Sequence, residues 1–164
     1  MEIKKYHSLG IIGRFKPLHN GGHNLLKEAC KRAEHVLIGI GSSNVYDSRN
    51  PFTAKESKEM IDRSLGKEFD NYTIIFIPDF FNGEKWKNYI INKFENIEYF
   101  VSGNNCVRDL LKNHFKLLSP EDLILSENKI ELNATQVRLE IRNGNNWKNL
   151  VPKEVALYLE NSYL

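Results

Sequence analysis

The sequence predicts an α/β fold built on a doubly wound parallel sheet with helices on both faces. Short apolar runs alternate along the chain with amphipathic helical patterns, as strand–helix–strand units require. The runs His35–Ile40 and Thr73–Phe80 are almost wholly apolar, which is typical of strands buried on both faces of a parallel sheet. The 164 residues, 41% of them hydrophobic, suffice for one core. We therefore expect a single domain over 1–164, with a C-terminal helical segment from about residue 134.

The order of the expected elements follows from these patterns and from their capping residues. We expect Thr53 to cap a helix, with Glu56 at the capping-box position. The last helix has Pro152 at its first position, where no backbone N–H is needed. The expected strands are Ser8–Ile12, His35–Ile40, Thr73–Phe80, Glu98–Val101, Leu123–Leu125 and Lys129–Leu132. The expected helices are Gly22–Ala33, Ala54–Leu65, Gly83–Lys93, Cys106–Asn113, Ala134–Arg142 and Pro152 to about Glu160.

Charge and cysteine content limit which binding partners and which cellular compartment we expect. The net charge is +2, with 23 basic and 21 acidic residues, so phosphate binding must come from local clusters and long nucleic acid is not expected. Cys30 and Cys106 lie far apart without CxxC spacing and no signal peptide precedes them, which favours free thiols in the cytoplasm. No apolar run approaches the ~20 residues that span a bilayer, so we expect no membrane association.

The stretch LGIIGRFKPLHNGGH, Leu9–His23, is an apolar strand that ends in a basic, glycine-rich turn and leads into a helix. Such a turn presents backbone N–H groups, basic side chains and imidazoles to a nucleotide's phosphates. In an open α/β sheet, ligands bind beyond the carboxyl ends of the strands. The loops Gly13–His23, Gly39–Asn44 and Ser102–Asn105 follow such ends, and we expect them to converge on one nucleotide.

The segment from Asn133 to Arg138 predicts a second phosphate-binding element. Either Asn133 or Thr135 can cap the helix that follows, whose positive end would point at an anion. Arg138 lies one turn further on the same face, so its guanidinium can reach the same oxygens. Taken alone, the segment is better explained by an ordinary N-cap and a solvated arginine.

Four segments together resemble the nucleotidyltransferase superfamily with the HxGH signature, and within it the archaeal type of nicotinamide-mononucleotide adenylyltransferase. These segments are GRFKPLHNGGH (13–23), GIGSSNVYDSRNPFT (39–53), IPDFFNGEKWKNYI (77–90) with VSGNN (101–105), and NATQVR (133–138) with WKNLVP (147–152). The resemblance implies a Rossmann-like fold and adenylyl transfer from ATP to nicotinamide mononucleotide (NMN), giving NAD and pyrophosphate. It also implies a homo-oligomer and Mg²⁺ carried by the phosphates, with no protein ligand assigned.

The resemblance assigns roles to particular positions of this sequence. His19, His23 and Arg138 would be the catalytic groups that stabilise charge on the leaving pyrophosphate. Asp79, Asn82 and Trp86 would form the acceptor pocket, with Trp86 stacking on the nicotinamide ring and Asp79 at its edge or holding the loop. The residues assigned to ATP binding are Gly13, Arg14, Phe15, Lys16, Gly39, Gly41, Gly103, Asn104 and Thr135.

The sequence departs from the family pattern at two positions. The signature reads His19-Asn-Gly-Gly-His23, one glycine longer than HxGH, which adds up to ~3.5 Å of chain. If the turn widens, both imidazoles converge; otherwise His19 is displaced. Lys16 stands where the family usually has glutamine.

Three other functions are compatible with these motifs. The same chemistry could use another phosphorylated acceptor or CTP. The chain could instead be a nucleotide-binding regulatory protein without catalysis, or an α/β domain without such a pocket.

Overall fold

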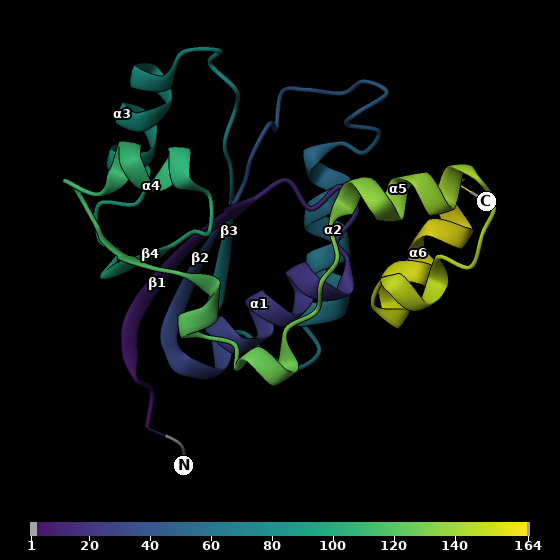
Figure 1. Cartoon of the computed structure of the whole chain (residues 1–164), viewed down its shortest axis with the longest axis horizontal. Coiled ribbons are helices and arrows are strands. Elements are labelled where there is room, and N and C mark those ends of the chain that lie inside the picture. The colour runs from purple at the N-terminus through teal and green to yellow at the C-terminus, as the bar shows by residue number, and fades with distance from the viewer. Residues whose placement is uncertain (1–2, 164) are drawn as a thin grey trace.

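The computed structural model describes residues 3–163 and contains a five-stranded, all-parallel sheet in the order β3-β2-β1-β4-β5 (Figure 1). The strand order reverses between β1 and β4, so the sheet is doubly wound and the predicted fold class is confirmed. The strands are β1 (Tyr6–Gly13), β2 (Ala33–Ile40), β3 (Tyr72–Phe76), β4 (Tyr99–Val101) and β5 (Lys116–Leu118).

Helices cover both faces of the sheet, as Figure 1 shows. They are α1 (Asn20–Arg32), α2 (Ala54–Leu65), α3 (Gly83–Lys93), α4 (Asn105–Leu111), α5 (Ala134–Arg142) and α6 (Lys153–Tyr163). Within the part of the chain that the structure describes, no helix is long and apolar enough to cross a membrane.

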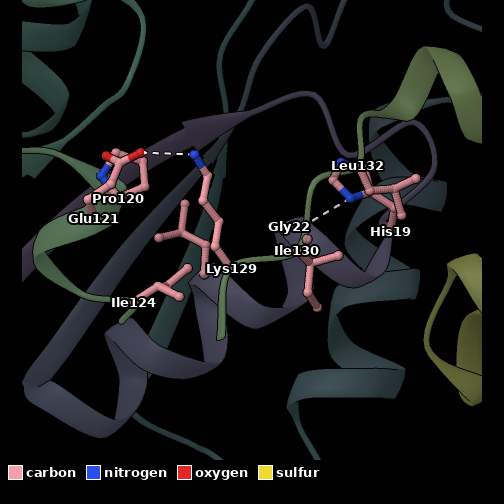
Figure 2. Close-up of a pocket in the computed structure, with 10 residues that line it drawn as sticks. His19, Gly22, Pro120, Glu121, Ile124, Lys129, Ile130 and Leu132 are labelled. Carbon is pink, nitrogen blue, oxygen red and sulfur yellow. Dashed lines mark hydrogen bonds and ion pairs between the residues drawn. The ribbon is translucent and has the colours of Figure 1, made fainter. Parts of the chain in front are cut away.

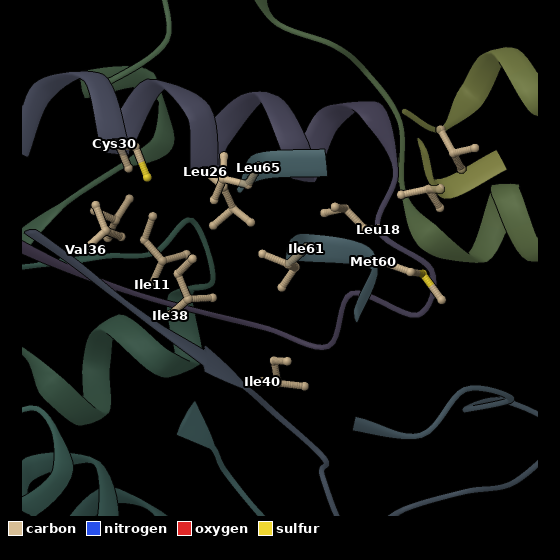
Figure 3. Packing of buried hydrophobic residues seen from close by; sticks show 14 of the residues in the cluster. Ile11, Leu18, Leu26, Cys30, Val36, Ile38, Ile40, Met60, Ile61 and Leu65 are labelled. Carbon is tan, nitrogen blue, oxygen red and sulfur yellow. The ribbon is translucent and has the colours of Figure 1, made fainter. Parts of the chain in front are cut away.

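Two hydrophobic clusters lie on opposite faces of the sheet. In the larger cluster, α1 and α2 pack on alternate residues of β1 and β2, and α6 packs on α2; Ile11, Leu26, Ile38 and Ile61 are buried at its centre (Figure 3). In the smaller cluster, α3 and α4 pack on the other face and bury Phe94, Phe100 and Leu111. Burial of these side chains contributes most of the favourable free energy of folding.

Four helices begin at a Thr or Asn side chain that caps them. Thr53 accepts a hydrogen bond from the Glu56 amide at 3.2 Å, as predicted. Asn133, and not Thr135, caps α5, and the side chain of Gln136 returns the bond to the Asn133 amide. The other caps are Asn82 for α3 and Asn104 for α4. Each such cap contributes ~1 kcal/mol to stability.

The region after β4 differs from the prediction. The expected strands Leu123–Leu125 and Lys129–Leu132 are wrong: a 3₁₀ turn forms at Pro120–Asp122, and another at Ser126–Asn128. The Ser119 hydroxyl and amide bond the Asp122 carboxylate, which closes the first turn and directs the chain away from the sheet. The last strand of the sheet is instead β5, which lies earlier in the sequence.

Two glycines allow the ring of Phe94, at the end of α3, to lie directly on the sheet. A Cβ atom on Gly10 would be 2.7 Å from Phe94 Cδ1. A Cβ atom on Gly39 would be 2.2 Å from Ile77 Cδ1 and 3.1 Å from Phe94 Cζ. The structure therefore places Gly39, which the resemblance assigns to ATP binding, under buried apolar side chains of the smaller cluster.

We predict that Gly39→Ala destabilises the protein by ~1–3 kcal/mol, because the added methyl group overpacks this contact. The measurement is the free energy of unfolding in urea. Gly83→Ala is the matched control, since a Cβ atom on Gly83 meets nothing within 4 Å. Equal stability of the two variants would contradict this account of Gly39.

Candidate nucleotide-binding site

Two cavities lie near the carboxyl edge of the sheet, on either side of the loop that follows β4. The first has a volume of about 240 Å³ and the second about 300 Å³. Gly103 lies against the ring of Pro120, which lines the first cavity, whereas Asn104 lines the second. The strand order reverses here, so these are the positions that the winding of the sheet favours for ligands.

The first cavity lies between the start of α1 and the irregular segment that precedes α5 (Figure 2). Its lining is mainly apolar, with Lys129 and Glu121 paired at 3.4 Å toward one end and His19 at the other. Asn24 donates a hydrogen bond to the Asn128 carbonyl, which holds that segment against α1. The apolar lining residues are Leu25, Pro120, Ile124, Ile130 and Leu132.

His19 caps α1 and faces the first cavity. Its Nδ1 accepts a hydrogen bond from the Gly22 amide at 3.2 Å. Burial lowers the pKa of His19, so the neutral ring is favoured near pH 7. Because Nδ1 is the acceptor, the proton of the neutral ring resides on Nε2, which leaves that nitrogen as a donor.

His23 lies elsewhere, because the extra glycine is part of the first helical turn. The His23 amide donates to the His19 carbonyl at 2.9 Å, so the turn is regular and has not widened. Gly21 and Gly22, but not His23, line the first cavity. The His23 ring lies among groups of α1, α2 and α6, and its pKa is lowered by burial first and by Lys27 next, against Glu154 and Glu68. The structure thus brings only one of the two histidines to the cavity.

The basic side chains of Arg14, Lys16 and Arg138 lie near one another beyond the end of β1. Arg138 donates to the Lys16 carbonyl at 2.8 Å and to the Thr135 hydroxyl at 3.1 Å. Burial lowers the pKa of Arg138, and the neighbouring charges of Arg14 and Arg142 lower it further. Arg14 also contacts Asn50, through a 3.4 Å hydrogen bond to the amide oxygen. Several cations close together at a sheet edge form a site suited to a polyanion.

Lys16 itself does not point into open space. Its side chain is 1% exposed, and Nζ donates to the carbonyls of Ser42 and Val45 at 3.1 and 2.9 Å. The ammonium therefore holds the loop after β2, although the resemblance assigns it to ATP.

Two further residues of the first loop and one of the second shape the strand ends. The ring of Phe15, whose φ is 54°, folds back over Gly13, so a Cβ atom on Gly13 would be 2.8 Å from Phe15 Cζ. The Gly41 amide donates to the Gly13 carbonyl at 2.9 Å, which joins the ends of β1 and β2.

The second cavity brings together all three predicted acceptor residues. Asp79, Asn82 and Trp86 line it, along with Phe80, Phe81 and the start of α4. The Asp79 carboxylate accepts from the Ser42 hydroxyl at 2.9 Å, and its amide donates to the Asn44 side chain at 2.8 Å. Asp79 therefore both lines the cavity and holds the loop.

Sequence reasoning missed two parts of the site. It did not find the apolar lining of the first cavity, because Ile124 and Ile130 were interpreted as strand residues. It also did not find Ser42 and Asn44 as partners of Asp79, although both lie in a loop that was expected at the site.

The two cysteines have different environments. Burial raises the pKa of Cys30 to about 12, whereas Cys106 is exposed and lines the second cavity. Within residues 3–163, no group of three or more His, Cys, Asp or Glu side chains is placed to hold a metal ion.

Comparisons with known proteins identify the family and agree with this fold. Residues 11–149 match the family described as cytidylyltransferase-like, and the chain belongs to it. Curated relatives named nicotinamide-nucleotide adenylyltransferase include that of Methanococcus aeolicus, 34% identical over 147 residues, covering 88% of this chain and 83% of that protein. That of Thermococcus sibiricus is 31% identical over 154 residues, covering 92% and 81%. The predicted family resemblance is confirmed.

Solved structures show the same fold. A bifunctional NMN adenylyltransferase/ADP ribose pyrophosphatase from Francisella tularensis aligns with a TM-score of 0.76 at 22% identity, covering 96% of this chain. The alignment covers 51% of that protein, so this chain spans about half its length. The NadR protein, solved with NAD and AMP-PNP, aligns with a TM-score of 0.64 at 16% identity, covering 90% of this chain and 46% of that protein.

We predict that the two signature histidines differ in function. His19→Ala should lower kcat for adenylyl transfer ~10²–10³-fold, the typical loss for one donor to a developing anion. His23→Ala should leave kcat within ~3-fold and lower the melting temperature, because its ring packs among three helices. Steady-state rates and thermal unfolding of both variants test this, and equal losses of kcat would refute it.

We also predict a pH dependence of stability that depends on His23. Burial lowers its pKa below the ordinary value near 6.5, so the folded protein favours the neutral ring. Its contribution is complete above about pH 6.5 and declines as pH falls toward the folded-state pKa, because the unfolded chain then binds the proton more readily. The drop in melting temperature from about pH 8 to about pH 5.5 should be smaller in His23→Gln.

Exposed His114 provides the control for that measurement. His114→Gln should show the same drop as the parent protein. A parent-like drop in His23→Gln would show that the imidazole of His23 does not carry the effect.

Proposed function

We propose that this chain transfers the adenylyl group of ATP to NMN, giving NAD and pyrophosphate. The observation that carries the proposal is the cluster of Arg14, Lys16 and Arg138 at the end of β1, together with two cavities near the same sheet edge, one apolar and one lined by Trp86. A dinucleotide has two ring systems joined through phosphates, so one basic cluster and two cavities suit the two substrates that form it. Relatives at 30–34% identity over most of their length bear the corresponding name.

ATP binds with its base in the first cavity and its phosphates along the start of α1. The apolar walls of this cavity suit a flat ring. Gly21 lets the wall at Ile130 approach α1, since a Cβ atom on Gly21 would be 3.3 Å from the Ile130 carbonyl oxygen. The phosphates reach the N-terminal amides of α1, the Nε2 of His19, and the paired side chains of Thr135 and Arg138.

NMN binds in the second cavity. Its nicotinamide ring stacks on the indole of Trp86, and Asn82 and Asp79 lie beside it. The Asp79 carboxylate, already bonded to Ser42, fixes the position of this cavity relative to the loop after β2.

The reaction needs no nucleophilic side chain. An oxygen of the NMN phosphate attacks the α-phosphorus of ATP in line, a new P–O bond forms, and the bond to the bridging oxygen of pyrophosphate breaks. His19 and Arg138 donate to the leaving oxygens as their charge grows, and Arg14 adds positive potential. Catalysis is then positioning together with charge neutralisation.

Mg²⁺ neutralises charge on the triphosphate when bound, and it is held mainly by phosphate oxygens and water, so no residue is named as its ligand. The basic donors of the site suit phosphate oxygens and not a bare cation. We further propose that the protein acts in the cytoplasm, in keeping with its unpaired cysteines, and as a homo-oligomer, in keeping with its family resemblance.

The proposal is tested by pyrophosphate release from Mg·ATP with and without NMN, with mass detection of NAD. We expect release that depends on NMN. Trp86→Ala should raise KM for NMN ~10-fold or more and leave ATP affinity unchanged, because Trp86 lines the second cavity and not the first.

CTP and other phosphorylated acceptors are assayed in parallel. Faster release with one of them would replace ATP or NMN in the proposal. Nucleotide binding without any product would support a regulatory protein instead.

A further inference from the structure

We propose that Lys16 is a positioning residue, whose buried ammonium sets the distance between the ATP phosphates and the acceptor cavity. The inference rests on the proposed function and deepens it. The ammonium ties together the loops after β1 and β2, and each of these loops belongs to one half of the site.

Hydrogen bonds form a continuous path through Lys16 from one half to the other. On the donor side, the Arg138 guanidinium bonds the Lys16 carbonyl at 2.8 Å. The Lys16 ammonium then bonds the Ser42 and Val45 carbonyls. On the acceptor side, the Ser42 hydroxyl bonds the Asp79 carboxylate at 2.9 Å. Asp79 lines the second cavity, so a shift at Lys16 reaches the acceptor.

Asn44 adds a second connection between the same loop and Asp79. Its side-chain amide donates to the Asp79 carbonyl at 3.1 Å, and its side-chain oxygen accepts from the Asp79 amide at 2.8 Å. The loop after β2 is therefore bonded at three points to Asp79 and at two points to Lys16. Such a loop transmits the position of one partner to the other.

The backbone at Ser42 is strained, and this strain indicates that the loop is held in place. Ser42 has a φ of 50° and is 8% exposed, and a left-handed conformation is strained in a non-glycine residue. Lys16 bonds its carbonyl and Asp79 bonds its hydroxyl. Without the ammonium, the two loop carbonyls would lose a charged donor in a buried place.

The surroundings show that Lys16 carries a charge at some cost. Burial lowers its pKa most and Arg14 lowers it further, whereas Asp47 and Asp79 raise it. A neutral amide, as in the glutamine usual for the family, would avoid this cost. The Lys16 side chain is long enough to reach two carbonyls of the neighbouring loop, and its ammonium donates a hydrogen bond to each of them.

The test compares Lys16→Met, which keeps length but removes all donors, with Lys16→Gln, which keeps an amide donor. We measure kcat, KM for NMN and the Kd for ATP, together with the melting temperature. For Lys16→Met we expect KM for NMN to rise ~10-fold or more and kcat to fall ~10-fold or more, because small displacements of reacting groups are costly. ATP affinity should stay within ~3-fold, and Lys16→Gln should recover part of the loss.

Lys55→Met is the matched control, since Lys55 lies exposed on α2. A purely structural role for Lys16 would lower the melting temperature and leave KM for NMN unchanged. That result would overturn the inference, as would an ATP affinity that falls as much as that for NMN, which would place Lys16 among the ATP ligands.

If Lys16→Met does not fold, Ser42→Ala tests the other end of the path by removing the bond to Asp79. It should raise KM for NMN without changing ATP affinity, and an unchanged KM would overturn the inference. A parent protein that forms no NAD would instead contradict the proposed function. An active parent with unaffected variants contradicts the role of Lys16 alone.

Discussion

The bond between the Arg138 guanidinium and the Lys16 carbonyl is the contact on which the site depends. It joins positions 122 residues apart and holds α5, a helix that follows the last strand of the sheet, against the loop at the end of β1. Val137, buried on the adjacent position of α5, anchors the same helix in the core. The guanidinium therefore arrives at the sheet edge already oriented, and little conformational entropy remains to be lost when phosphate binds.

The first turn of α1 combines a structural and a chemical role. The His19 ring satisfies the Gly22 amide, so the cap also fixes which ring nitrogen carries the proton. The glycines let the segment around Ile130 approach closely, which forms one wall of the first cavity. An added residue in this turn changes which side chain faces the cavity without changing the cap, and this is why His23 packs among helices.

Fold and site differ in how far the sequence determines them. The apolar runs at β2 and β3 and the cap Thr53 are local signals, and these elements were predictable. β5 has only three residues and was missed, because its pairing with β4 is not encoded locally. Asp79 and Trp86 line one cavity, whereas the contacts of Lys16 depend on a loop 26 residues away that no periodicity describes.

The electrostatics of the site favour the bound state over the free one. Burial first, and then the charges of Arg14 and Arg142, lower the pKa of Arg138, whereas Asp47 and Asp79 raise the pKa of Lys16. The free protein therefore keeps an uncompensated positive region at the end of β1. In the complex we propose, the triphosphate would remove this repulsion and, by linkage, stabilise the folded chain. The cations that repel one another in the empty site would attract the negative charge of the leaving pyrophosphate. The same positive charge would therefore destabilise the empty site and assist the reaction.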